Sequence, residues 1–149
     1  MQDNLKLVRL FWVLLAVVAG GRWALSLRGM PYAVGNPVFS IVTLTLLSAL
    51  FYGAFLRAWG GQGVVRAMTL GALIGLSAQV VIFASTAISY LAGIESYFNH
   101  PIALNVEQAI PMGEALARRF GGLVIGTVNA AVAAALGWAL GWLLPERPR

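Results

Sequence analysis

Four long apolar runs fill most of this 149-residue chain and constrain its fold more than any other feature. They cover residues 10–27, 37–56, 67–94 and 120–144, and short polar or basic segments separate them. A run of about 18 apolar residues can cross the hydrocarbon layer as a helix. Lipid offers the backbone no hydrogen-bonding partner, so spanning segments are helices or closed barrels. Because the runs lack the alternation of barrel strands, we predict an all-α integral membrane protein.

We predict one transmembrane domain, residues 1–149, in which four helices form an antiparallel up-down bundle. The helices are expected over residues 8–28, 37–57, 65–94 and 118–144. An extramembrane loop, residues 95–117, should join the third and fourth helices and carry a short amphipathic helix. Pro111 can begin that helix, and Glu114 lies four residues before Arg118, which is a stabilising spacing.

The first run has an alternative interpretation as a cleaved signal sequence. Lys6 and Arg9 precede it, and residues 17–19 are typical of a small-residue cleavage site. However, the apolar character resumes after Gly20 and Gly21, and the whole run is long enough to span. We therefore favour a retained helix.

Composition and charge support the membrane class. The chain is 60% hydrophobic and 10% charged, whereas soluble domains carry about 25% charged residues. Its net charge of +5 comes from basic residues at the ends of the runs, so we expect no nucleic-acid partner. With four crossings, six basic residues share a side with the two termini, and four lie opposite. Cytoplasmic segments are enriched in Lys and Arg, so both termini are predicted to be cytoplasmic.

Arg22 lies inside the first expected span, where a charge is costly. It precedes Arg28 by six residues, about 9 Å along a helix, so its side chain could reach the interface. The alternative is an ion pair with Glu95, which directly follows the third run on the same side. The pair Arg22–Glu95 is thus a candidate interfacial ion pair.

Small residues recur every three or four positions along the fourth run. Such residues let transmembrane helices approach closely, so we predict that this stripe packs against protein, either in the same chain or in a second one. The stripe consists of Gly122, Gly126, Ala130, Ala133, Gly137 and Gly141.

Polar side chains inside the spans form a second predicted group. Gln79, Thr86 and Tyr90 share one face of the third helix, and Asn129 lies in the fourth. An unpaired amide in hydrocarbon is costly. These residues therefore either hold helices together by hydrogen bonds or line a small polar cavity.

Catalytic and metal-binding constellations are not evident. His100 is the only histidine, there is no cysteine, and the spacing of the glutamates matches no ligand motif. No nucleophile motif such as GxSxG is present. We expect no catalytic residue, no metal, no cofactor and no enzymatic activity.

These observations favour a non-enzymatic accessory or scaffold subunit of a membrane assembly. Its expected partners are the lipid bilayer and a membrane protein or a second copy of the chain. The alternative is a small-solute or ion transporter that uses the polar group as an intramembrane cavity. A scaffold needs no cavity, a transporter needs one near the midplane, and an enzyme would need His100 close to carboxylates.

Overall fold

The computed structural model describes residues 6–145, and the regular structure within them is helical. The elements are α2 (Arg9–Leu27), α3 (Tyr32–Val38), α4 (Ile41–Ala58), α5 (Val64–Leu91), the 3-10 helix η1 (Pro101–Leu104), α6 (Met112–Leu140) and η2 (Gly141–Leu143). Four segments are long and apolar enough to cross a membrane: Arg9–Leu27, Tyr32–Ala58, Val64–Leu91 and Met112–Leu143. The prediction of an all-helical chain with four membrane-capable helices is confirmed.

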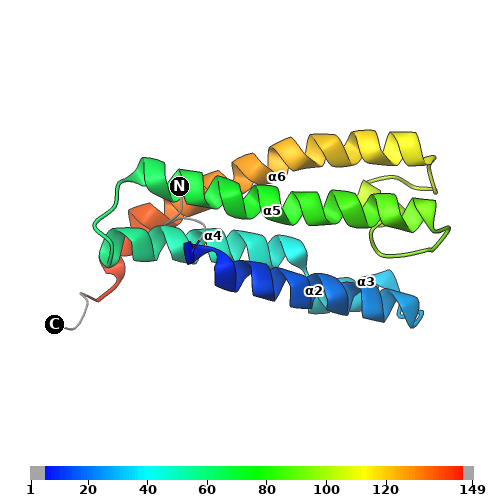
Figure 1. The fold of residues 1–149 in the computed structure, drawn as a ribbon, viewed down its shortest axis with the longest axis horizontal. Helices are drawn as coiled ribbons and strands as arrows, with labels where there is room; N and C mark the ends of the chain where they lie inside the picture. Colours follow the sequence, from blue (N-terminus) through cyan, green and yellow to red (C-terminus); the bar gives the residue numbers. More distant parts are fainter. Residues whose placement is uncertain (1–5, 146–149) are drawn as a thin grey trace.

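The long helices lie side by side, and their connections gather at two ends of the molecule (Figure 1). The turn between α4 and α5 lies at one end. The α2–α3 connection and the longer segment 92–111 lie at the other end. Of the four spans, α4, α5 and α6 pack most extensively on one another, while α2 is attached more loosely.

Small residues set the spacing of α6 against α5 and α4. A Cβ placed on Gly71 of α5 would lie 2.5 Å from the carbonyl oxygen of Ala130, and one on Gly137 of α6 would collide with the carbonyl oxygen of Leu50. Ala130 and Ala134 are completely buried. The first part of α6 thus packs on α5 and the last part on α4, with backbones in direct contact.

The members of the predicted stripe differ in their surroundings. Gly126, Ala130, Gly137 and Gly141 lie against α4 or α5. Gly122 has only the Gln79 side chain near it, because a Cβ added at this glycine would lie 3.9 Å from Oε1 of Gln79. Ala133 is half-buried, and its neighbour Ala134 takes the fully buried position instead.

The second span is broken, and this break was not predicted. α3 contains Pro37, which lacks an N–H and cannot complete a regular helix. The chain leaves the helix at Phe39, and α4 starts again at Ile41. Ser40 caps the new start by accepting a hydrogen bond from the Thr43 N–H at 3.2 Å.

The segment between α5 and α6 is shorter than the predicted loop 95–117. α5 ends before Gly93, whose φ of +64° allows N–H groups of residues 93 and 94 to close the last turn. α6 already begins at Met112, directly after Pro111, a residue that favours the start of a helix. Ala115, near this start, is completely buried. The residues predicted to form a short amphipathic helix are therefore the first turns of α6.

Candidate anion-binding site

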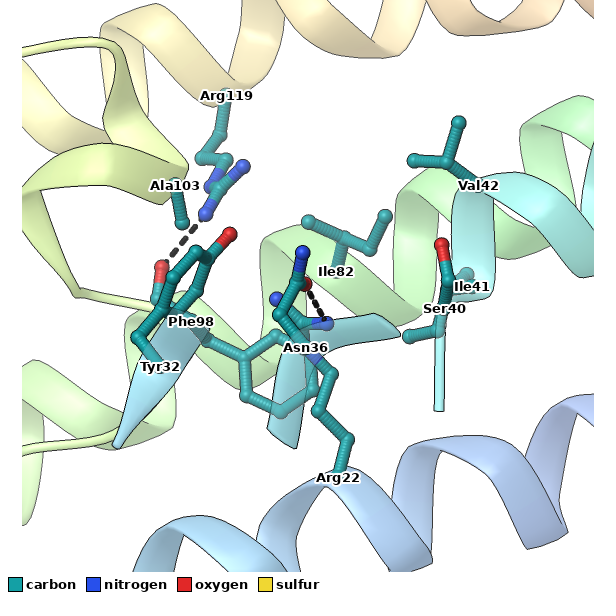
Figure 2. Close-up of a pocket in the computed structure, with 10 residues that line it drawn as sticks. All are labelled: Arg22, Tyr32, Asn36, Ser40, Ile41, Val42, Ile82, Phe98, Ala103 and Arg119. Atoms are coloured by element: carbon teal, nitrogen blue, oxygen red, sulfur yellow. Dashed lines mark hydrogen bonds between the residues drawn. The ribbon is translucent and has the colours of Figure 1, made fainter. Parts of the chain in front are cut away.

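A cavity of about 220 Å³, lined by both polar and apolar residues, lies at the end of the bundle that holds segment 92–111. Five helices and that segment contribute to its walls (Figure 2). The lining residues are Arg22, Tyr32, Asn36, Ser40, Ile41, Val42, Ile82, Phe98, Ala103 and Arg119. Two of them are arginines, and they enter the cavity from α2 and α6, on opposite sides.

Arg22 points into protein and not toward the lipid interface. It is only 8% exposed and donates a hydrogen bond from Nη1 to Oδ1 of Asn36 in α3. Its guanidinium also lies 5.3 to 5.7 Å from the ring centroids of Tyr32, Tyr97 and Phe98. At these distances aromatic faces attract a cation, so the charge is held in place without a carboxylate.

Arg119 is held by the end of α5 and by the connection that follows it. Its Nε donates to Oγ1 of Thr86 at 3.0 Å, and its Nη2 donates to the carbonyl oxygen of Phe98 at 2.6 Å. The preceding Arg118 is exposed and pairs with Glu114 at 2.9 Å. Because successive helical residues differ by about 100° around the axis, Arg119 is directed inward.

The connection after α5 is folded onto the bundle, which fixes the position of Phe98. Tyr97 and Phe98 are buried. The Tyr97 hydroxyl donates to the carbonyl oxygen of Met30 at 2.6 Å. Asn99 closes a tight turn by accepting from the Ser96 N–H at 2.7 Å. These bonds tie the α5–α6 connection to the end of α2.

The broken second span brings a helix N-terminus to the cavity. Ser40, Ile41 and Val42 begin α4 and also line the cavity. The first N–H groups of a helix have no partner within it, and the helix dipole makes this end partially positive. Interrupted transmembrane helices use such ends to bind anions.

The cavity is therefore positively charged without a compensating carboxylate among its described lining residues. The charges of Arg22 and Arg119 repel one another. Each guanidinium has five N–H donors, of which Arg22 uses one and Arg119 uses two in hydrogen bonds to described residues. N–H donors of both arginines thus remain for a ligand. The site can therefore bind an anion.

A second cavity, of about 380 Å³, adjoins the first at Ala103 and Arg119. Gln79 and Arg118 also line it, together with Gly122 of α6. Arg119 therefore lines both cavities. Only the first of them contains both inward-pointing arginines.

The residues of the predicted polar group do not form one cluster. Thr86 is completely buried and binds Arg119, while the Tyr90 hydroxyl donates to the carbonyl oxygen of Ile110 at 2.8 Å. Gln79 lies at the second cavity. Asn129 is exposed on the outer face of α6, because Ala130 and not Asn129 faces α5.

The predicted pair Arg22–Glu95 is likewise not brought together within residues 6–145. Arg22 binds Asn36, whereas Glu95 is exposed and is one of the residues that line a different cavity. His100 stacks on Tyr32, and its Nδ1 accepts from the Ile102 N–H. No group of three or more His, Cys, Asp or Glu side chains within residues 6–145 could hold a metal ion.

Sequence reasoning missed Asn36, Phe98 and Arg119 as parts of a site. One available clue was that Glu114 can pair with Arg118 but not with Arg119 on the same helix, which leaves Arg119 for another partner. A second clue was the sequence Asn36-Pro37, because proline within a span frees backbone groups. Nothing local indicated that Phe98 folds back onto the bundle.

No protein-family model, curated protein or solved structure that we compared with the chain matches it. We therefore infer the function of the chain from the geometry of the cavity.

Proposed function

We propose that this chain is a multi-pass membrane protein that binds a small anionic group in the cavity between Arg22 and Arg119. The observation that supports this most is that both guanidinium groups line one cavity with no described carboxylate beside them. A charge removed from water is costly unless it is paired. Two such charges that repel one another lower the stability of the fold. A bound anion would compensate for both of them.

The position of the cavity favours binding from one side over passage through the protein. Arg22 lies five residues before the end of α2, about 7.5 Å along the helix, and Arg119 lies seven residues after the start of α6, about 10 Å. This places the site one to two turns inside the bundle, far from the other end. The transporter hypothesis required a polar cavity near the midplane of the membrane. The cavity between Arg22 and Arg119 lies closer to one end of the bundle.

The proposed topology is an antiparallel up-down bundle with both termini and the turn 59–63 in the cytoplasm. The six-to-four distribution of basic residues supports this orientation. Segment 92–111 would then be external, and the cavity would receive its anion from the external side of the membrane.

A second candidate, the accessory or scaffold subunit, is favoured by Asn129. This amide is exposed near the middle of α6, where a lipid neighbour could not satisfy it. A helix of another membrane protein, or of a second copy, could supply the missing hydrogen bonds. This role would use the outer face of α6 and is compatible with the anion site.

The test of the proposed function is anion-dependent thermal stabilisation of the purified protein in mild detergent. A ligand that binds only the folded state raises its stability with concentration. Sulfate should raise Tm more than chloride does at matched ionic strength, because only specific binding survives that comparison. The Arg22→Gln variant should lose at least tenfold in sulfate affinity, since a hydrogen bond to a charged group contributes about 1.5–3 kcal/mol.

Arg28→Gln is the matched control. It removes the same charge just past the end of the same helix, from an exposed side chain outside the cavity. Its sulfate response should equal that of the wild type. If Arg28→Gln and Arg22→Gln weaken the response equally, the effect comes from net charge and the proposed site is wrong.

A further inference from the structure

We infer that the ligand group is a phosphate monoester or inorganic phosphate in its dianionic form. This inference rests on the proposed anion site and specifies its ligand class. Three features of the cavity carry the inference: its charge, its arrangement of donors and the apolar side chains in its lining.

The charge of the cavity matches two negative charges. Arg22 and Arg119 contribute two positive charges, and no described lining residue is acidic. A monoanion, such as a phosphodiester or a carboxylate, would leave one positive charge uncompensated in a largely buried site. A dianion neutralises both and also removes their mutual repulsion.

The donors are directed at an acceptor that has several oxygens. The two guanidinium groups approach from opposite sides (Figure 2), and each is a planar fork suited to two oxygens of a phosphate. The N-terminus of α4 forms a further wall at Ser40 and Ile41. Backbone N–H groups at a helix N-terminus are a common phosphate contact.

The remaining wall leaves room for an organic substituent. Val42 and Ile82 bring apolar side chains to the cavity, where a charged oxygen would find no donor. In a phosphate monoester three oxygens carry the charge, and the fourth bears the carbon substituent that could lie on this side. The same chemistry occurs in a soluble phosphate ester and in a lipid whose headgroup is a phosphate monoester.

The first arm of the test compares glycerol phosphate, dimethyl phosphate and sulfate by thermal stabilisation of the wild-type protein in detergent between pH 5 and pH 8. The second ionisation of a phosphate monoester has a pKa of about 6. Its apparent affinity should therefore rise roughly tenfold over this range. Sulfate is a dianion throughout and should show no such rise, and the diester, a monoanion, should bind at least tenfold more weakly than the monoester at pH 8.

The titratable and charged groups around the site give a distinguishable pH dependence. Arg22 and Arg119 face the ligand, Tyr32 lines the cavity, and His100 stacks on Tyr32 with ring centroids 4.5 Å apart. Sulfate keeps its charge between pH 5 and pH 8, so the sulfate series measures any pH dependence that groups on the protein contribute. A His100→Gln variant measures the part that depends on His100.

The second arm identifies the source of the phosphate. The protein is placed in lipid nanodiscs that contain phosphatidate, a monoester lipid, or phosphatidylglycerol, a diester lipid, and retained lipid is measured by native mass spectrometry. Selective retention of phosphatidate, lost in Arg22→Lys and kept in Arg28→Gln, indicates a lipid headgroup. Monoester preference in the soluble arm alone indicates a free phosphate ester.

The outcomes separate this inference from the proposed function. Binding that depends on Arg22 but is equal for monoester and diester at pH 8 overturns the dianion inference and leaves the anion site intact. If no anion gives stabilisation that depends on Arg22, both are wrong. The wild-type pH series needs no variant, so misfolding of a substituted protein cannot obscure the result.

Discussion

At the scale of single residues, the partners of each arginine explain where it points. Arg118 has a carboxylate four residues before it and stays on the surface. Arg119 donates hydrogen bonds to the Thr86 hydroxyl and the Phe98 carbonyl oxygen. Arg22 donates to the amide oxygen of Asn36 and lies close to three aromatic rings. Neutral partners fix the direction of a guanidinium and leave its charge available to a ligand.

The first prediction concerns the partner of Arg22. A double-mutant cycle of Arg22→Gln with Asn36→Leu should give a coupling of about 1.5–3 kcal/mol in the free energy of unfolding, since it removes one part-buried hydrogen bond from a charged group. The corresponding cycle with Glu95→Gln should be additive within about 0.5 kcal/mol. Reversible unfolding in mixed detergent measures both. Coupling to Glu95 and none to Asn36 would contradict the assignment of Asn36 as the partner.

At the scale of helices, close backbone contact between α6 and its neighbours depends on glycine at particular positions. Gly137 faces the Leu50 carbonyl oxygen, whereas a Cβ on Gly121 would meet nothing within 4 Å. The two glycines lie on one helix and differ only in what surrounds them.

The second prediction uses this pair. Gly137→Ala should lower the free energy of unfolding by about 1–3 kcal/mol, because the added methyl group forces the α4–α6 contact apart. Gly121→Ala should be neutral or stabilising by up to about 1 kcal/mol, as expected for alanine in a helix. Thermal unfolding in detergent compares them. Equal destabilisation by the two substitutions would mean that α4 and α6 do not meet backbone to backbone at Gly137.

The helices could be predicted from sequence because a membrane-spanning segment is either a helix or a barrel strand, and the four apolar runs lack the alternation of barrel strands. The break in the second span and the residues that each helix turns inward could not be predicted. Glycine and proline are unfavourable inside helices, so Gly35 and Pro37 led us not to predict α3. In the structure Gly35 lets α3 lie against Tyr97, because a Cβ at this position would clash with the Tyr97 hydroxyl. The cavity joins residues from segments that are distant in sequence, so no local pattern revealed it. Asn129 was assigned to the interior because an unpaired amide is costly in lipid. It lies outside because Ala130 faces α5, and no local pattern indicated this rotation of α6.

At the scale of the whole molecule, the connections at one end form the cavity and those at the other end close the bundle. There Arg57 lies 4.5 Å from the Trp138 ring centroid, and the Trp138 indole donates to the Gln62 carbonyl oxygen at 2.6 Å. The proposed orientation puts the cavity end outside the cell.

The third prediction tests this orientation. The natural sequence contains no cysteine, so single cysteines can be labelled without background. Glu107→Cys, at an exposed position in segment 92–111, should react with a membrane-impermeant reagent in intact cells. Gln62→Cys should react only after the membrane is permeabilised. The reverse pattern would place the cavity on the cytoplasmic side.

The central claim is that Arg22 and Arg119 serve one anion, and a double-mutant cycle performed with and without sulfate tests it most directly. The cycle combines Arg22→Gln and Arg119→Gln and measures the free energy of unfolding. Without sulfate the two arginines should couple unfavourably, because their charges repel. With saturating sulfate the coupling should become favourable, because either substitution alone already removes the stabilisation by the bound anion. A coupling energy that does not change with sulfate would contradict the claim.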